Sequence, residues 1–579
     1  MMNFMNKLTM MRRNLLLFAC MFLVVFITSA QKLTKEYDVV IYGATSAGIS
    51  AALQCSRMQK TVLLIEPTHR IGGLTTGGLG ATDIGSKVAI GGISREFYQN
   101  IKRYYEQHQN WKWQDKSDYH QSRNEEGEDA MWTFEPSVAL TVYREMMEKE
   151  HIDLVYNNRL LRDGGVMKDN SRITEIKMIS GEVYKGKMFI DATYEGDLLA
   201  ATGVSFTVGR ESNKQYGETL NGVQLDKINT TIKKSISHNA LHHNFINRVD
   251  PYVIKGDPDS GLLPFVSSDP PGVDGEGDEK IQAYCFRMTL TDHPDNRIPF
   301  RKPDNYNELD YELLFRNYEA AEGPIEEMYS YGDPLVPWIN TPMPNRKTDT
   351  NNQKGFSTDY IGQNYAYPEA SYEEREMIIE AHLNYQMGLM WTLAYHPRIP
   401  EEVRNVVSRW GVCKDEFTDN KEQWTHQLYI REARRMISDY VMTQRNCEGV
   451  EVADDPVAMA GYGMDSHHVQ RYVDVNGYLQ NEGNVEARGY PPYPVSFRSI
   501  VPKKSECTNL LVPVCISASH IAFGSLRMEP VFMVLGQSAA IAAAQAIDDR
   551  QNVQDVDYEK YRVTLLKYKQ ILNEPVNKN

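Results

Sequence analysis

The chain has 579 residues, with 77 acidic and 62 basic side chains and a formal charge of −15. This excess of negative charge argues against a protein that binds nucleic acid or an anionic membrane surface. The length is enough for two or three domains of ordinary size.

Residues 1–30 have the pattern of a secretory signal peptide. Basic residues precede an apolar run from 15 to 27, and small residues at 28–30 stand before a predicted cleavage site at Gln31. The apolar run is short for a membrane span, and no later segment is predicted to be transmembrane. We therefore expect the mature protein to be periplasmic or secreted.

Residues 37–66 follow the pattern of a βαβ unit that binds a dinucleotide. Residues 39–42 form a short apolar strand, residues 49–58 a helix, and residues 61–65 a second strand that ends at Glu66. The helix start favours a pyrophosphate, and an acidic residue about twenty positions after the glycine turn binds the ribose. The predicted contacts in this unit are Gly43, Thr45, Ser46, Ala47, Gly48, Glu66 and Pro67.

The glycine pattern differs from the full G-x-G-x-x-G at its middle position. Gly43 and Gly48 hold the first and last positions, but Thr45 stands where the second glycine is expected. The threonine side chain must therefore turn away from the cofactor or bind a phosphate oxygen itself.

The segment after Glu66 favours FAD over NAD. Residues 72–80 are rich in glycine, and an extended glycine-rich loop lets the backbone lie against a large planar ring and donate N–H groups to it. A nicotinamide-binding unit normally continues into another helix at this point. The predicted contacts are Gly72, Gly73, Leu74 and Thr75.

Helices and strands alternate as far as residue 208. Helices are predicted at 93–107 and 137–150, strands at 152–156 and 187–190, and a hairpin over 173–184. The strand at 187–190 runs into Asp191, Ala192 and Thr193, where we expect the chain to return to the cofactor. Residues 31–208 are therefore predicted to be the first part of an FAD-binding domain.

The character of the chain changes over 209–490, where prolines, aromatic residues and polar loops dominate. Long helices are predicted at 372–391 and 428–443, and the 432–435 run is expected to place ion pairs on one helix face. We interpret residues 209–490 as an inserted substrate domain.

The chain then returns to the FAD-binding domain over 491–550. A strand is predicted at 509–514 and an alanine-rich helix at 530–546, whose N-terminal dipole faces the flavin pyrimidine. Glu529 and Gly536 are predicted contacts, and residues 551–579 form a C-terminal helix and tail. The predicted fold is α/β: a Rossmann-like FAD-binding domain of the ββα type with a parallel sheet, and a large inserted α+β substrate domain.

The cysteines and histidines do not suggest a metal site. Six cysteines follow the signal peptide without metal-ligand spacing, and His467 and His468 lack the offset that lets two histidines share a metal from one helix face. Cys507 and Cys515 are the pair that an oxidising compartment would allow to form a disulfide.

A set of segments carries a further signal: residues 43–48, 191–197, 208–211, 344–349, 464–471, 517–520, 528–530 and 536–540. Together they resemble the FAD-dependent oxidoreductase family of large, often exported bacterial flavoproteins, over nearly the whole mature chain. The resemblance implies one FAD per chain, in a fold similar to glutathione-reductase-type and fumarate-reductase-like flavoproteins, and no particular substrate. These flavoproteins often carry an acidic residue after the last strand to hold the ribityl chain, whereas Val514 is followed here by Cys515-Ile516-Ser517.

Hydride exchange at flavin N5 requires a group that manages a proton, and histidine suits this task because its pKa lies near neutrality. We expect His468 to be this base, with His467 as the alternate. Asp465 is expected to orient the base, and Arg471 to hold a substrate oxygen. His520 is a further candidate base, and Arg527 is a candidate to offset charge at flavin N1.

The leading hypothesis is an exported FAD-dependent oxidoreductase that takes a hydride from a small hydroxyl compound, such as a sugar or glycoside, for an unknown electron acceptor. A second is a fumarate-reductase-like reductase of an activated C=C bond, with arginines that clamp a carboxylate. The arginines available for such a clamp are Arg287, Arg431, Arg471 and Arg527. The remaining hypotheses are a polysaccharide lyase, with the FAD absent or vestigial, and a non-catalytic carbohydrate-binding protein on the same fold.

Overall fold

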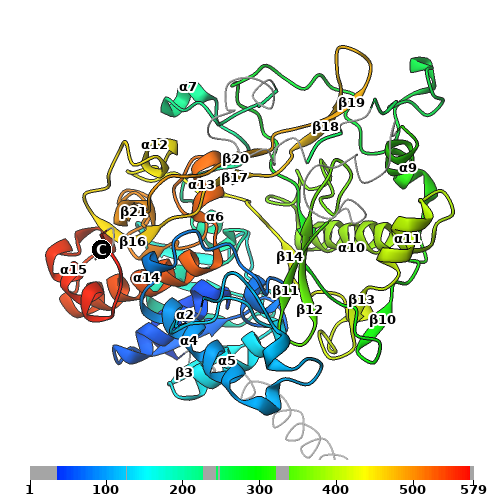
Figure 1. The fold of residues 1–579 in the computed structure, drawn as a ribbon. Helices are drawn as coiled ribbons and strands as arrows, with labels where there is room; N and C mark the ends of the chain where they lie inside the picture. Colours follow the sequence, from blue (N-terminus) through cyan, green and yellow to red (C-terminus); the bar gives the residue numbers. More distant parts are fainter. Residues whose placement is uncertain (1–34, 126, 226–242, 246–247, 321–337, 574–579) are drawn as a thin grey trace, which may run out of the picture.

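The computed structural model describes residues 35–125, 127–225, 243–245, 248–320 and 338–573 (Figure 1), so the predicted signal peptide lies outside the described residues. A seven-stranded sheet joins segments from both ends of this chain. β1 pairs in parallel with β2 and β6, β2 with β3, and β22 with β6. The strand order is β3 (Ile152–Val155), β2 (Val62–Ile65), β1 (Glu36–Tyr42), β6 (Val183–Asp191), β5 (Arg172–Lys177) and β4 (Val166–Asp169), with β22 (Leu510–Leu511) also on β6.

Two helices pack on this sheet and on each other: α2 (Ser46–Arg57) and α14 (Glu529–Asp549). A Cβ added at Gly536 would lie 2.2 Å from the carbonyl oxygen of Ala47, so glycine permits a close crossing of the two helices. α14 is the one helix in the described part of the chain that is long and apolar enough to span a membrane, and 94% of its most apolar window is buried inside the protein. It is a core helix of the described structure.

A second sheet of five strands lies beside the first, in the region predicted to be inserted (Figure 1). All its pairs are antiparallel. The order is β10 (Arg297–Pro299), β13 (Gly411–Cys413), β9 (Met288–Thr291), β12 (Lys347–Asn352) and β11 (Trp338–Met343). The long helix α10 (Tyr372–Tyr395) begins at a capping box, in which Ser371 and Glu374 each accept a hydrogen bond from the other's backbone N–H.

The remaining elements are further helices and two-stranded ribbons. The helices are α3 (Gly73–Thr76), α4 (Gly92–Glu106), α5 (Pro136–Glu148), α6 (Asp197–Ala201), α7 (Asn213–Tyr216), α9 (Glu312–Glu319), α11 (Glu401–Val407), α12 (Gln444–Cys447), α13 (His520–Leu526) and α15 (Tyr558–Lys567). The strands are β7 (Phe206–Thr207), β8 (Cys285–Phe286), β14 (Leu428–Tyr429), β15 (Arg435–Met436), β16 (Pro456–Ala460), β17 (Met464–Ser466), β18 (Gln470–Val473), β19 (Leu479–Glu482), β20 (Val485–Ala487) and β21 (Tyr493–Ser496).

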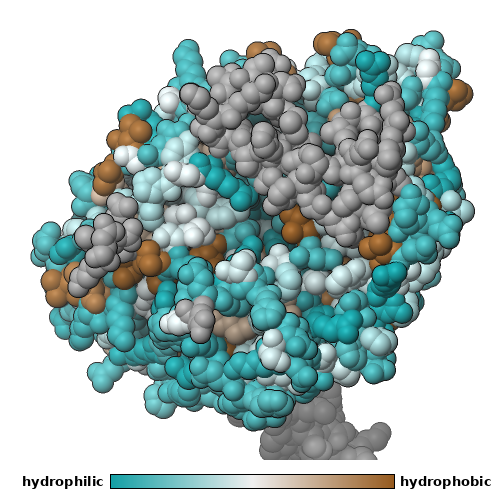
Figure 2. All heavy atoms as spheres, in the orientation of Figure 1, coloured by the Kyte–Doolittle hydropathy of each residue, from teal (hydrophilic) through white to brown (hydrophobic). Residues whose placement is uncertain are grey.

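The predicted fold class is confirmed, since a Rossmann-like parallel sheet is combined with mixed α and β structure. The βαβ unit, the helices near 93–107, 137–150, 372–391 and 530–546, and the hairpin over 173–184 occur within a few residues of their predicted positions. The exact domain boundaries stay predictions. The face of the molecule in Figure 2 is mostly hydrophilic, with hydrophobic residues in separate small groups.

The helix predicted at 428–443 is wrong. This segment contains only the two-residue strands β14 and β15, and is otherwise irregular. Its arginines are buried and pair with different segments: Arg434 with Asp197, Arg435 with Glu211. A regular helix presents one face to one neighbour, so ion pairs in several directions favour an extended backbone. The ion pairs expected at 432–435 exist, but not on a helix face.

Three smaller predictions also differ from the structure. The glycine-rich segment 72–80 is not wholly extended, because residues 73–76 form the helical turn α3. The strand predicted at 509–514 is only two residues long, as β22. Cys507 and Cys515 are both free and buried, and the Cys515 thiol donates to the carbonyl oxygens of Thr193 and Tyr194 instead.

Candidate functional site

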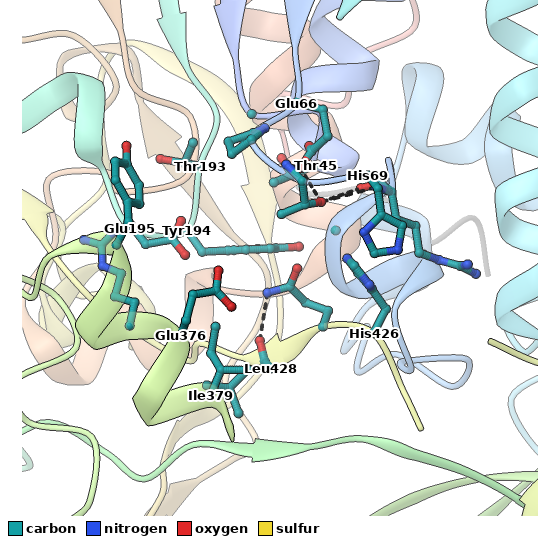
Figure 3. A pocket seen from close by; sticks show the side chains of 18 of the residues that line it. Thr45, Glu66, His69, Thr193, Tyr194, Glu195, Glu376, Ile379, His426 and Leu428 are labelled. Atoms are coloured by element: carbon teal, nitrogen blue, oxygen red, sulfur yellow. Dashed lines mark hydrogen bonds between the residues drawn. The ribbon is translucent and has the colours of Figure 1, made fainter. Parts of the chain in front are cut away.

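A cavity of about 620 Å³ lies where β1, β2 and β6 end, and we call it the first cavity. Figure 3 shows Thr45 and Glu66 on one side of it, with Glu376 and Ile379 of α10 facing them. Of the predicted cofactor contacts, it is lined by Gly43, Thr45, Glu66, Pro67, Gly73 and Thr193. The sequence therefore identified one wall of the cavity, and α10 supplies the opposite wall.

Glu66 is buried at the end of β2 and held in place by the backbone around it. Its carboxylate accepts hydrogen bonds from the Ala44 backbone N–H (3.0 Å), the Thr68 backbone N–H (2.8 Å) and the Thr68 hydroxyl (2.7 Å). Burial raises the pKa of Glu66 to about 7, although these hydrogen bonds act in the opposite direction. The position and the fixed orientation suit a group that binds the hydroxyls of a ribose.

The turn between β1 and α2 leaves no room for larger residues. Gly43 has φ +95°, and a Cβ at Gly48 would lie 1.9 Å from the carbonyl oxygen of Gly43. Thr45 caps α2: its hydroxyl accepts from the Gly48 N–H (3.4 Å) and donates to the carbonyl oxygen of Ala192 (2.7 Å). The threonine hydroxyl is thus bonded to the protein backbone, while Thr45 still lines the first cavity.

The segment around Gly72 and Gly73 is linked to the start of α14 by the side chains of Tyr194 and Thr75. Gly72 and Gly73 have left-handed φ angles of +94° and +52°, and a Cβ at Gly73 would lie 2.4 Å from the Tyr194 hydroxyl. That hydroxyl accepts from the Leu74 N–H and donates to Glu529 (2.7 Å), and the Thr75 hydroxyl donates to the other oxygen of Glu529 (2.8 Å). Glu529 is therefore tied to the protein in this structure.

The other predicted cofactor contacts support the walls of the first cavity and do not line it. Asp191 ends β6, where it accepts hydrogen bonds from Thr193 and from the Leu199 N–H, and burial raises its pKa to about 6. Gly536 lies at the crossing of α14 and α2. Ser46, Ala47, Gly48, Gly72, Leu74, Thr75, Ala192 and Glu529 are likewise buried outside the cavity lining.

The residues present fit an ADP-containing cofactor. The first cavity offers the start of helix α2, a glycine turn that a Cβ would fill, and a buried acidic residue at the end of the second strand. His69 and His426 lie together at one end of the cavity, with ring centroids 4.6 Å apart (Figure 3). Burial lowers the pKa of His426 to about 3, so this imidazole is neutral.

A second cavity has a volume of about 390 Å³, and its lining includes Arg287, the residue after Phe286 of the first cavity. Its lining is mostly polar. The residues that the argument below uses are His243, Asn351, Asn352, Asp465, His467 and Asn484.

His467 lines the second cavity and is oriented from behind by Asp359. The two side chains are 2.8 Å apart, from His467 Nδ1 to Asp359 Oδ2. Asp359 also forms an ion pair with Arg431 (3.0 Å); burial acts to raise its pKa, but Arg431 and His467 lower it, so it is a carboxylate. A carboxylate only accepts, so Nδ1 of His467 donates the proton.

The free nitrogen of His467 is therefore an acceptor. Burial and the Arg431 guanidinium lower the pKa of His467 below its ordinary value, although Asp359 opposes them. The imidazole is accordingly neutral at pH 7, and its Nε2 carries a lone pair. Nε2 lies 3.9 Å from Asp465 Oδ1, across a space too wide for a direct hydrogen bond. His467 has the geometry of a general base with a fixed tautomer.

The structure places the other catalytic candidates elsewhere. His468 is buried outside the second cavity, and burial and His243 lower its pKa well below the ordinary value. His520 lies between Glu432 (2.8 Å) and the Ser466 hydroxyl (3.0 Å), and it lines neither cavity. Arg527 donates to the Tyr429 hydroxyl and to the backbone carbonyl of Asp465 (3.1 Å).

Arg471 is buried with its guanidinium 4.8 Å from the ring centroid of Phe356, and it has no carboxylate partner among the described residues. It does not line the second cavity. The catalytic roles of these residues stay predictions, but the geometry favours His467 over His468 as the base.

Sequence reasoning missed Asp359, because it lies 108 residues from His467 in the loop before α10 and no local motif surrounds it. It also missed the asparagines of the second cavity. Their amides contribute Asn351 Oδ1, Asn352 Oδ1 and Asn484 Nδ2, which are buried and have no hydrogen-bond partner within the described ranges. No spacing in the sequence signals these positions. No group of three or more His, Cys, Asp or Glu side chains in the described part of the chain is arranged to hold a metal ion.

Comparison with known proteins adds a family. A family model described as FAD dependent oxidoreductase matches residues 38–565. Among solved structures, T. acidophilum thioredoxin reductase is 17% identical over 27% of this chain and 34% of that chain, with a TM-score of 0.15. The oxidized steroid monooxygenase bound to NADP is 19% identical over 28% of this chain and 27% of that chain, with a TM-score of 0.20. L-amino acid deaminase from Proteus vulgaris is 16% identical over 32% of this chain and 54% of that chain, with a TM-score of 0.22. The chain thus spans about a third of the thioredoxin reductase, and no curated protein matches it.

Proposed function

Because this chain belongs to the FAD dependent oxidoreductase family, we propose that it transfers a hydride between a small hydroxyl compound in the second cavity and the flavin. Sugars and glycosides are the leading candidates for the substrate. FAD, when bound, exchanges a hydride at its N5 position. The single observation that carries the proposal is the neutral, oriented His467 on the wall between the substrate cavity and the buried Asp359.

His467 acts as the base in this proposal. Asp359 fixes the tautomer through Nδ1, so Nε2 is the atom that takes the hydroxyl proton of a substrate. A positioned base of this kind accelerates a reaction about a hundredfold to ten-thousandfold. Asp359 in turn keeps its charge because Arg431 lies 3.0 Å away.

The charges around the second cavity favour an uncharged substrate. Its cationic side chains already have partners: Arg287 binds Asp349 (2.8 Å), and Lys87 binds Glu125 and Glu128 (3.0 Å each). Arg123 donates to backbone carbonyls, and Arg488 lies 3.2 Å from Glu486. A carboxylate substrate would have to compete with these pairs, whereas hydroxyl groups can pair with the amide side chains that line the cavity without breaking an ion pair.

The alternative reaction, reduction of an activated C=C bond, needs arginines that are free to clamp a carboxylate. Arg287 and Arg431 are each paired with an aspartate, and Arg527 is held by Tyr429 and a backbone carbonyl. Arg471, the fourth candidate, has no carboxylate partner among the described residues, but it does not line the second cavity. These positions weigh against the reductase. Family membership sets aside a lyase and a non-catalytic binding protein, because it makes the chain an FAD-dependent oxidoreductase.

We also propose that the protein is exported, on the basis of the signal-peptide pattern in residues 1–30. The mature form is expected to begin at Gln31. N-terminal sequencing of protein recovered from outside the cytoplasm tests this directly, and an intact N-terminus in the cytoplasmic fraction would contradict it.

The proposed reaction is tested on the purified mature protein. It should be yellow and release one FAD per chain on denaturation. Under anaerobic conditions, at least one member of a panel of neutral sugars and glycosides should bleach the flavin. Reoxidation of the dithionite-reduced protein by fumarate, with no bleaching by any hydroxyl compound, would favour the reductase instead.

A further inference from the structure

Two hydrogen-bond acceptors face each other in the second cavity. One is Nε2 of His467, whose other nitrogen donates to Asp359 (2.8 Å). The other is the carboxylate of Asp465, whose Oδ1 lies 3.9 Å from that Nε2. Both side chains line the cavity, and both come from the same short stretch around β17. A ligand between them must supply a proton to each.

A single alcohol group cannot do this. A hydroxyl carries one proton, so it donates to His467 or to Asp465 but not to both. A water molecule has two protons and can bridge such a gap. A substrate that replaces this water therefore has to bring two donors that lie next to each other.

Two neighbouring hydroxyls can supply the two donors, and so can one amino group. The rest of the cavity lining distinguishes between these two kinds of ligand. The amide side chains of Asn351, Asn352 and Asn484 also line the cavity, and an amide offers both donors and an acceptor. An ammonium group only donates, whereas hydroxyls donate and accept. A compound with several hydroxyls therefore matches a lining that both donates and accepts better than an amine does.

We propose that Asp465 is a specificity-determining residue that makes this site select vicinal diols, with the reacting hydroxyl on His467 Nε2 and the adjacent hydroxyl on Asp465. The inference rests on the proposed function. Asp465 is itself held on its other side, since Arg527 donates to its backbone carbonyl (3.1 Å) and the Tyr462 hydroxyl lies 3.5 Å from its Oδ2.

The chemical step balances with these two contacts. The C–H bond of the reacting carbon breaks and its hydride, with both electrons, passes to flavin N5. The O–H proton passes to His467 Nε2, and a C=O bond forms. The neighbouring hydroxyl keeps its proton and donates to Asp465 throughout.

The test compares binding with reduction on the FAD-loaded enzyme. The probes are methyl hexopyranosides and methyl pentopyranosides, the analogues of each in which one ring hydroxyl is replaced by hydrogen, cyclohexanol and cyclohexylamine. Binding is measured by anaerobic titration calorimetry, and flavin reduction is followed separately by absorbance. The variants are Asp465→Asn, Asp465→Ser and, as a control on the exposed surface, Asp454→Asn.

At least one glycoside should bind, and loss of one of two adjacent hydroxyls should weaken it about tenfold or more, because a hydrogen bond to a charged group is lost. The ratio of the dissociation constant of the deoxy analogue to that of its parent glycoside should fall close to one in both Asp465 variants and persist in Asp454→Asn. The inference would be overturned by tighter binding of cyclohexylamine than of any glycoside, or by an Asp465 variant that keeps the parental ratio. Absence of binding by every glycoside would also overturn it.

The two readouts separate this inference from the proposed function. Flavin reduction by cyclohexanol as fast as by any glycoside, in the parent and in Asp465→Asn alike, would refute the diol site while hydride transfer from a hydroxyl stands. Diol-selective binding that depends on Asp465, with no flavin reduction by any probe, would support the diol site and refute the reaction.

Discussion

Replacement of Glu66 tests whether the first cavity is the dinucleotide site. The carboxylate accepts hydrogen bonds from Ala44 and Thr68 within the protein and is expected to accept one or two more from the ribose. A hydrogen bond to a charged group contributes about 1.5–3 kcal/mol. Glu66→Ala should therefore weaken FAD binding roughly tenfold to 150-fold for each bond lost.

The same substitution removes support from the protein itself. The backbone N–H groups of Ala44 and Thr68 lose their acceptor in a buried place, at about 1–3 kcal/mol each. Glu66→Gln keeps an acceptor oxygen, so its stability should stay closer to that of the parent while FAD affinity still falls. The two variants thus separate the two effects.

The assay is fluorescence titration of the apoprotein with FAD, together with thermal unfolding. Glu175→Ala is a matched control, because Glu175 lies in the same sheet and pairs with Lys185 near the surface. If both Glu66 variants fold and bind FAD as tightly as the parent, the dinucleotide binds elsewhere and the reasoning fails.

Three further predictions concern the turn, the base and the pH dependence. Gly48→Val should abolish FAD binding, because a Cβ there lies 1.9 Å from the Gly43 carbonyl oxygen and must push α2 from β1; a folded variant with parental affinity by titration would contradict this. Asp359→Asn should slow flavin reduction about a hundredfold or more. Because Asp359 raises the pKa of His467, its loss should also move the acidic limb of the profile of reduction rate against pH to lower pH. An unshifted limb would refute the pairing. The pKa of Glu66 is raised to about 7, so its contribution to apoprotein stability is full below pH 4.5 and is lost as the pH rises through 7. The unfolding free energy of Glu66→Gln, measured by circular dichroism, should therefore depend less on pH in this window.

The sequence was informative where the signal is local. The strand, glycine turn, helix and strand that end at Glu66 are neighbours in the chain, and their apolar pattern and spacing follow directly from how a βαβ unit packs. The same holds for α14, whose alanine content marks a helix buried on all sides. These elements position the first cavity.

The rest of the site depends on contacts between distant segments. Asp359 reaches His467 across 108 residues, and nothing in either segment indicates the other. The 428–443 segment was mistaken for a helix because its charges resemble a solvated face. In the structure, Arg431 and Arg434 are buried and find partners on other segments, which overrides local propensity. The choice between His467 and His468 could not be made from the sequence, because adjacent residues point to different sides and only the fold decides which side faces a cavity.

Anaerobic flavin reduction in His467→Ala and His468→Ala, with the best glycoside of the panel, tests the central claim most directly. His467→Ala should keep its FAD and its fold but reduce the flavin roughly a hundredfold to ten-thousandfold more slowly than the parent. His468→Ala, which alters a buried side chain outside the second cavity, should stay near the parental rate if it folds. A His467→Ala enzyme that reduces its flavin at the parental rate would contradict the claim that this histidine is the base.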